Sequence, residues 1–125
     1  MKQKPDENRM IWRAMFDENI RDGLFELLIL QLLSEGSRDA FELYREIGIR
    51  TEGSFCRKTS FYTVLYRLLH RELVSADFTQ TSETEATIYS IMSPGREYLA
   101  YGKLQLECVF DGVAAFFGQA ERPHS

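Results

Sequence analysis

The stretch Lys58-Thr-Ser-Phe-Tyr-Thr-Val-Leu-Tyr-Arg-Leu-Leu-His-Arg-Glu-Leu-Val74 decides how the rest of the chain is interpreted. Its apolar residues recur three and four positions apart, which is the spacing of one buried stripe on an amphipathic helix. These residues are Phe61, Val64, Leu65, Leu68 and Leu69. The opposite face offers hydroxyls, an aromatic ring and cations, the side chains that contact phosphates and base edges. It comprises Ser60, Thr63, Tyr66, Arg67, His70 and Arg71.

The same region is a basic island in an acidic protein. From Ser54 to Arg71 there are four Lys or Arg residues and no Asp or Glu, whereas the chain of 125 residues has a net charge of −4. An acidic total argues against a protein that coats nucleic acid without regard to sequence, but it is compatible with a specific binder that has a local basic face. We therefore interpret this segment as a helix that enters a DNA groove.

Three further helices are predicted ahead of the basic helix. Apolar periodicity indicates a short amphipathic helix over Arg9–Ile20 and a longer one over Gly23–Ser34, with Gly36 as its C-cap. Asp39 is the expected N-cap of the third helix, with Glu42 three residues later in a capping-box arrangement. This third helix is expected to bury Phe41, Leu43, Tyr44 and Ile47 and to end near Gly48.

A hairpin and a long helix are predicted after the basic helix. Leu73–Thr81 and Ala86–Met92 alternate with period two around a polar turn, the pattern of a β-hairpin. Ser93 is the expected N-cap and Pro94 the first-turn residue of a helix that ends at Gly118. The predicted division is an N-terminal arm or helix over 1–20, a DNA-binding domain over 21–92, a C-terminal helix over 93–118 and a disordered tail over 119–125.

This order of elements is typical of a winged helix-turn-helix, a mainly α fold with a two-stranded wing, here with a long C-terminal dimerisation helix. The apolar stripe of the last helix is longer than a small three-helix core can cover, so we expect a second copy of the chain to cover it in a two-fold homodimer. The expected interface residues are Leu99, Leu106, Val109, Phe110, Val113, Phe116 and Phe117. Symmetry would also place two recognition helices for a palindromic operator.

Four segments resemble the PadR family of transcriptional regulators, in its short subfamily with one C-terminal helix. Arg21–Gly36 resembles the glycine-started first helix, and Ala40-Phe-Glu-Leu43 resembles the start of the second, His-Gly-Tyr-Glu-Leu. Ser60–Leu68 resembles Thr-Leu-Tyr-Pro-Ala-Leu-Arg-Arg-Leu in the recognition helix, and Ile88–Glu97 resembles the family's exit from the wing. Together they cover about residues 21–100.

The chain departs from the family pattern at several positions. Asp39 and Ala40 stand where the family has His-Gly, Thr63 where it often has Pro, and Glu72 where a Gly usually precedes the wing. At the wing tip, where the family usually carries Arg or Lys, this chain has Glu83 and Glu85. We expect these two carboxylates to hold the tip away from DNA phosphates.

The resemblance implies a sequence-specific DNA-binding regulator, a repressor released by a small aromatic or hydrophobic effector. The candidate DNA-binding residues are Arg57, Lys58, Thr59, Ser60, Tyr62, Thr63, Tyr66, Arg67 and Arg71. The candidate effector residues are Trp12, Phe16, Phe110 and Phe117, although an aromatic stripe at helical spacing is more often plain core or dimer seam. The alternative function is a winged-helix protein-interaction module without strong DNA binding, which the acidic total and acidic wing favour.

Other classes of protein are disfavoured by composition. Two histidines, His70 and His124, and two separated cysteines, Cys56 and Cys108, supply neither a nucleophile–base pair nor a metal cluster, so we expect no enzyme, metal or cofactor. Reduced thiols fit a cytoplasmic protein. The most apolar stretch contains Glu26, so no membrane-spanning helix is expected.

Overall fold

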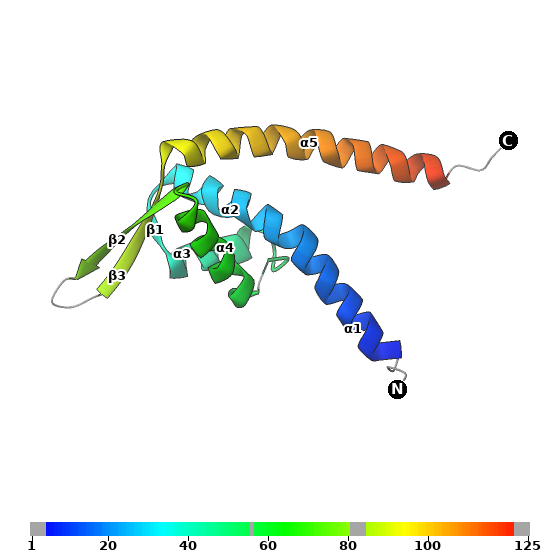
Figure 1. Ribbon diagram of the computed structural model, residues 1–125, viewed down its shortest axis with the longest axis horizontal. Helices are drawn as coiled ribbons and strands as arrows, with labels where there is room; N and C mark the ends of the chain where they lie inside the picture. The colour runs from blue at the N-terminus through cyan, green and yellow to red at the C-terminus, as the bar shows by residue number, and fades with distance from the viewer. Residues whose placement is uncertain (1–4, 56, 81–84, 122–125) are drawn as a thin grey trace.

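Figure 1 shows the protein as a computed structural model, which describes residues 5–55, 57–80 and 85–121. In chain order the elements are α1 (Pro5–Phe16), a π-helical turn η1 (Asp17–Arg21), α2 (Asp22–Glu35), β1 (Arg38–Asp39), α3 (Ala40–Arg50), α4 (Lys58–His70), β2 (Val74–Gln80), β3 (Glu85–Ile91) and α5 (Ser93–Glu121). This is a mainly α winged helix-turn-helix with a long C-terminal helix, so the predicted fold class is confirmed.

The core lies where α2 meets α3, α4, β3 and the first turns of α5. Helix α2 is central because apolar side chains cover most of its circumference, as expected for a helix with neighbours on several sides. Its buried apolar residues are Phe25, Ile29, Leu30, Leu32 and Leu33. They pack against Leu43 and Ile47 of α3 and the buried stripe of α4. The core therefore fixes α4 directly against α2.

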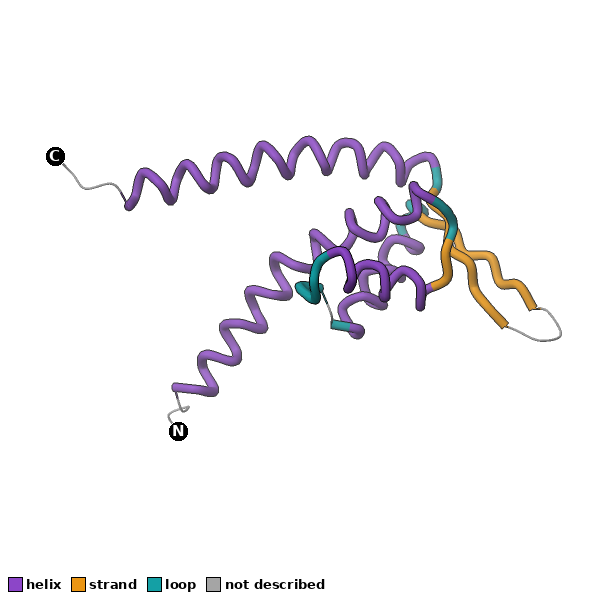
Figure 2. Tube along the Cα trace, turned by 180° about the vertical axis from the view of Figure 1, so that it is seen from behind, coloured by secondary structure: helices purple, strands orange, loops and turns teal. Residues whose placement is uncertain are grey.

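The first two helices form one rod, which corrects the predicted break near residue 21. Neither Phe16 nor Arg21 makes a side-chain cap, and both have right-handed helical φ and ψ. Without a capped end the chain passes from α1 through η1 into α2 without leaving helical geometry. In Figures 1 and 2, α1 then extends away from the body of the protein.

Helix α3 begins as predicted but continues further. The Asp39 carboxylate accepts a 2.8 Å hydrogen bond from the backbone N–H of Glu42, which confirms the N-cap. The helix reaches Arg50, two residues past Gly48, near which its end was predicted. The predicted burial of Phe41 is wrong, since this ring is 71% exposed. Phe41 is two residues from the buried Leu43, and that offset places it on the opposite face of a helix.

The wing is confirmed, and the sheet contains one strand that the sequence did not predict. Strands β2 and β3 pair antiparallel from Val74 opposite Ile91 to Gln80 opposite Glu85. The two-residue β1 pairs with the other edge of β3, giving the order β1-β3-β2. A strand of two residues is too short to show alternation. Beyond the core the hairpin projects outward, as Figure 2 shows, and Phe78 is exposed.

Two backbone positions shape the ends of the neighbouring elements. Gly36 is the C-cap of α2, as predicted, but its φ of 162° is extended rather than left-handed. Glu72, which stands where the PadR family usually has a glycine, adopts a φ of 61°. This left-handed conformation favours glycine, because a side chain there brings Cβ close to the following carbonyl oxygen. The turn between α4 and the wing is therefore strained at Glu72.

Helix α5 is longer than predicted and has two different halves. It begins at Ser93, the residue expected to precede it as N-cap, and passes through Gly118 to Glu121. Residues 119–121 of the predicted tail are thus helical, and 122–125 lie outside the described residues. Near its start Leu99 is buried against the core, whereas most side chains after Gly102 are exposed. Among the described residues no helix is both long and apolar enough to cross a lipid bilayer.

Candidate nucleic-acid interface

Helix α4 has a fully buried side and an exposed one. Phe61, Val64, Leu65 and Leu68 are each 0% exposed, and Leu69 is half-buried, which confirms the predicted stripe. On the opposite side Thr59, Thr63, Tyr66 and His70 are exposed at successive spacings of four, three and four residues. The outer face therefore offers hydroxyl, phenol and imidazole groups along the whole helix, in a form that can enter a groove.

Two tyrosines and two threonines give this face its shape. The ring of Tyr62 lies with its centroid 5.2 Å from that of Phe61 in the core and 6.1 Å from that of Tyr66 outside it. Tyr62 is therefore half-buried and braces the exposed Tyr66 from below. The Thr63 hydroxyl donates a 3.0 Å hydrogen bond to the backbone carbonyl of Thr59, so its oxygen can still accept a hydrogen bond.

The start of α4 concentrates positive charge. Arg57 is the N-cap residue, has extended backbone geometry and makes no side-chain cap, while the first turn contains no acid. The unpaired N–H groups of a helix N-terminus attract anions, and the adjacent cations strengthen that attraction. Here Arg57, Lys58 and Thr59 are exposed and Ser60 is half-buried, so four of the predicted site residues lie together.

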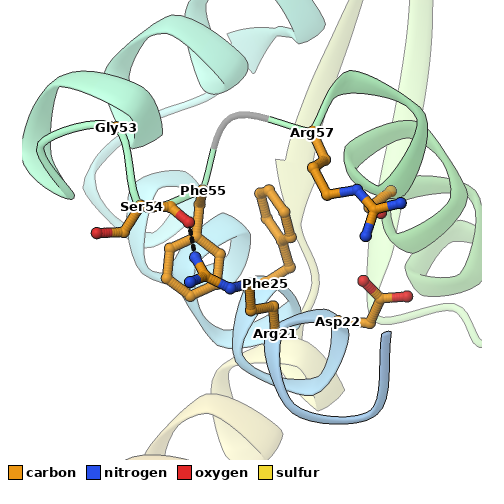
Figure 3. A pocket seen from close by; sticks show the side chains of 8 residues that line it. Arg21, Asp22, Phe25, Gly53, Ser54, Phe55 and Arg57 are labelled. Carbon is orange, nitrogen blue, oxygen red and sulfur yellow. Dashed lines mark hydrogen bonds between the residues drawn. The ribbon is translucent and has the colours of Figure 1, made fainter. Parts of the chain in front are cut away.

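A cavity of about 270 Å³ lies beside this end of α4 and is drawn in Figure 3. It is lined by Arg21, Asp22, Phe25, Gly53, Ser54, Phe55, Arg57 and Ser60. The Arg21 guanidinium donates to the Ser54 carbonyl and lies 5.6 Å from the centre of the Phe55 ring. Phe55 in turn packs edge-on against Phe25, with centroids 5.0 Å apart. These contacts fasten the loop before α4 to α2, and Cys56 within that loop lies outside the described residues.

Arg67 of α4 and Arg71, the C-cap residue of α4, both contact α2. The Nη1 atoms of Arg67 and Arg71 are 3.4 Å and 3.3 Å from Oε1 of Glu26, a residue of α2 that is only 5% exposed. The segment Ser54–Arg71 contains no acid of its own, but two of its four cations pair with an acid on the neighbouring helix α2. The negative charge of Glu26 makes the basic face electrostatically weaker than the sequence count implied. The count missed this partner because it lies 41 and 45 residues away along the chain.

Glu26 is the partner of two candidate site residues that the sequence interpretation missed. It was noted only as a charge that interrupts an apolar stretch. A carboxylate within the apolar stripe of a buried helix carries a signal of its own, because a buried charge is expected to be paired. Among the described residues, no three His, Cys, Asp or Glu side chains gather in a way that could hold a metal ion.

The wing differs from the helix in charge. Its two strands, Val74–Gln80 and Glu85–Ile91, contain no Lys or Arg but do contain Asp77 and Glu85, both exposed. Glu83, the other acid predicted at the tip, lies outside the described residues. The described part of the wing therefore offers no cation to a phosphate backbone.

The residues predicted for an effector lie on two helices that diverge. Trp12 and Phe16 line an open groove of about 550 Å³ on α1 together with Arg9, Arg13 and Arg21. Phe110 and Phe117 lie on the far half of α5, and Figures 1 and 2 both show the ends of α1 and α5 far apart. A single chain therefore does not bring the four aromatic residues together.

Most residues predicted for a dimer interface are uncovered in one chain. Val109, Phe110, Val113, Phe116 and Phe117 are exposed, and Leu106 is half-buried. Leu99 is the exception, because it is 7% exposed and belongs to the core of its own chain. Residues on α1 and η1 add a second uncovered apolar surface, comprising Met10, Ile11, Trp12, Met15, Phe16 and Ile20.

The fold of this chain is similar to that of several solved transcriptional regulators. A transcriptional regulator from Clostridium thermocellum has 25% sequence identity, with a TM-score of 0.71 over 78% of this chain and 94% of that one. A PadR-like transcriptional regulator from Bacillus cereus is 23% identical, with a TM-score of 0.64 over 76% and 92%. A PadR family regulator from Clostridium difficile is 18% identical, with a TM-score of 0.63 over 74% and 97%. The protein thus has the PadR-like winged-helix fold.

Sequence comparison adds a nearer relative. No protein-family model matches the chain. It is 32% identical over 88 residues to an uncharacterised protein from Lysinibacillus sphaericus, and the match spans 69% of this chain and 81% of that protein. The chain belongs to the family of that protein.

Proposed function

We propose that this protein is a sequence-specific DNA-binding transcriptional regulator. The observation that supports the proposal most strongly is the exposed outer face of α4, with Thr59, Thr63, Tyr66 and His70 in a line opposite the buried stripe. In a winged helix-turn-helix the side chains on that face enter the major groove. Similarity to solved transcription regulators supports the same conclusion.

Within this proposal the parts of α4 have separate tasks. Arg57, Lys58 and the free N–H groups of the first turn contact phosphate and set the register of the helix. Thr63 and Tyr66 contact base edges, to which hydroxyl groups can both donate and accept. The wing contributes little, because a phosphate beside Glu85 meets repulsion rather than attraction.

The proposed active form is a homodimer that associates through two arms, which are α1 and the part of α5 after Gly102. The exposed apolar residues of α1 and of α5 after Gly102 are numerous for a monomer, and large exposed apolar patches on soluble proteins mark interaction sites. A second copy related by a two-fold axis covers the same surface on both chains and places two α4 helices for a palindromic operator. Leu99 is left out of this proposed interface.

The proposed effector is a small aromatic compound that binds between the arms of the dimer and releases a repressor from its operator. Trp12 and Phe16 supply the apolar part of the site, and Arg9 and Arg13, which line the same groove, favour an anionic ligand. Trp12 is the only tryptophan, so its fluorescence reports directly on this groove. A panel of aromatic carboxylates that changes neither Trp12 emission nor DNA affinity would remove the effector from the proposal.

The central test is selection of bound sequences from random duplex DNA, followed by titration of the selected duplex and a scrambled one at two salt concentrations. Arg57→Ala should weaken binding to both duplexes and lower the salt slope of binding by about one unit. Tyr66→Ala should weaken mainly the selected duplex, by about 1–3 kcal/mol if the phenol contacts a base. Lys103→Ala is the matched control, because Lys103 lies on α5 and donates to Gln31 of α2.

The alternative is a winged-helix module that binds protein and not DNA. The net charge of −4 and the acidic wing favour it. Failure of the selection to enrich any sequence, together with equal weak binding of all duplexes, would support this alternative and reject the regulator.

A further inference from the structure

Glu26 is a buried charge at the point where three helices meet. It lies in the second turn of α2 among apolar neighbours, with 5% of its surface exposed. An ionised carboxylate removed from water needs partners for both oxygens, because its lost hydration is costly. Those partners come from α4 and α5 rather than from α2 itself.

The two oxygens of Glu26 face different helices. Oε1 lies 3.4 Å from the Nη1 atom of Arg67 in α4 and 3.3 Å from that of Arg71, the C-cap residue of the same helix. Oε2 accepts a 2.6 Å hydrogen bond from the Tyr98 hydroxyl of α5. This bond, with burial and the charge of Glu26, raises the pKa of the Tyr98 phenol, so the hydroxyl stays protonated as a donor.

Close packing of α5 holds Tyr98 in place. A Cβ atom at Gly95 would lie 2.2 Å from the Leu73 carbonyl oxygen, and one at Gly102 would lie 2.6 Å from a Leu27 methyl carbon. Only glycine allows the first of these approaches, because the neighbour is backbone. Leu99 is buried between the two glycines along the same helix face. The position of Tyr98 relative to Glu26 is therefore set by the docking of α5 on the body.

We infer that Glu26 is a positioning residue for DNA recognition, which holds Arg67 and Arg71 on the flank of α4 and links their position to α5 through Tyr98. The inference rests on the proposed DNA-binding function. Both arginines keep part of their surface exposed, with side-chain exposures of 37% and 52%, so a phosphate backbone beside α4 competes with Glu26 for them. While Glu26 holds them, binding depends on the outer face and favours the correct sequence.

Removal of the charge is the direct test. Glu26→Gln keeps the shape of the side chain but removes the ion pairs. The two arginines then become available to phosphate, and the salt slope of DNA binding should steepen by up to about two units, one for each cation. Affinity for a scrambled duplex should rise more than affinity for the selected one, because phosphate contacts add no sequence preference. A loss of stability alone would change neither the slope nor the ratio of affinities.

The matched control is Glu35→Gln. Glu35 also pairs with two arginines, Arg50 at 2.9 Å and Arg38 at 3.6 Å, but neither belongs to α4. This variant should leave the salt slope and the preference between duplexes as they are in the wild type. An equal steepening in both variants would show that net charge and not the position of Glu26 is responsible, and would overturn the inference.

Tyr98→Phe tests the link to α5 with a milder change. It should alter affinity for the selected duplex by about fivefold or more in the wild-type background and have no effect when combined with Glu26→Gln, since the phenol acts only through that carboxylate. Equal effects in both backgrounds would overturn the link.

If wild-type protein prefers no duplex, the proposed function fails and the inference falls with it. If the wild type does prefer one while Glu26→Gln matches it in slope and preference, only the inference fails.

Discussion

The body of the protein and its two arms use apolar residues in opposite ways. In the body, residues such as Leu30, Leu43 and Val64 are buried completely within one chain. On the arms, α1 and α5 after Gly102, residues of the same kind such as Trp12 and Phe110 are more than half exposed. Helical periodicity is the same in both regions, so periodicity shows that a face is to be buried but not by which chain. The arms are where a second copy is to be sought.

A buried charge should separate the two regions most strongly. Val113→Asp places a carboxylate in the proposed dimer seam without a partner, at a cost of several kcal/mol to association. The variant should sediment as a monomer while its circular dichroism stays helical. In the body, Val64→Asp should instead prevent folding, because Val64 is 0% exposed within its own chain. A Val113→Asp protein that sediments as the wild-type dimer does would move the seam elsewhere.

The wing extends from the body as a third projection, and reversal of its charge should have the next largest effect. Replacement of Glu83 and Glu85 by Lys should tighten DNA binding without changing the preferred sequence, because backbone contacts add affinity and no sequence choice. The salt slope should steepen by about one to two units for the two added cations. Glu97→Lys with Glu107→Lys changes the net charge equally from α5 and serves as the control. Weaker binding by the wing variant would mean that the glutamates make a contact that binding needs.

Glu72 offers a smaller change confined to the body. Its φ of 61° is a left-handed conformation, which costs a non-glycine residue about 1–2 kcal/mol. Glu72→Gly removes that strain but adds chain entropy to the unfolded state, so unfolding free energy should rise by up to about 1 kcal/mol. Glu107→Gly, in the exposed part of α5, should lower it by about 0.5–1 kcal/mol. Urea unfolding measures both, and a loss of stability in Glu72→Gly would contradict the strain.

The smallest expected effect concerns acid stability. Hydrogen bonds from Arg50 and Gln31 lower the pKa of Glu35 from 4.5 to about 2. Because the folded-state pKa is the lower one, the stabilisation is present above about pH 4.5 and is lost as the pH falls toward 2. Glu35→Gln should therefore lose less stability than the wild type between pH 5 and 3, in melts at low salt. The difference should shrink at high salt, because the Glu35 carboxylate is accessible to solvent and its interactions are screened.

How far the sequence could predict the fold depended on how local each signal was. The stripe of α4, the hairpin and the Asp39 cap each rest on residues a few positions apart, and all three are confirmed. Helix ends were predicted near Gly48 and at Gly118, but a glycine inside a helix costs only about 1 kcal/mol, and α3 and α5 continue past these glycines to Arg50 and Glu121. Strand β1 exists only because β3 lies beside it.

The candidate site was harder to predict, because its decisive contacts are long-range. Arg67 and Arg71 were counted as free cations, since their partner is more than forty positions away along the chain. The link from Glu26 to Tyr98 spans 72 residues. The one signal in the sequence was a charged residue, Glu26, within an apolar helix. That signal predicts that the charge has partners, but it does not identify them.

The π-helical turn at Asp17–Arg21 has a consequence for the azimuth of the N-terminal arm. An α-helix advances about 100° per residue, and a π turn takes up one additional residue without interrupting the rod. The direction in which Trp12 points around the axis is therefore set by a count of residues and not by a flexible joint. Deletion of one residue in this turn would restore the α-helical ladder of hydrogen bonds and leave Trp12 facing nearly the same way. Deletion of one residue from the regular α-helix between Trp12 and the turn would swing Trp12 by about 100° relative to the body.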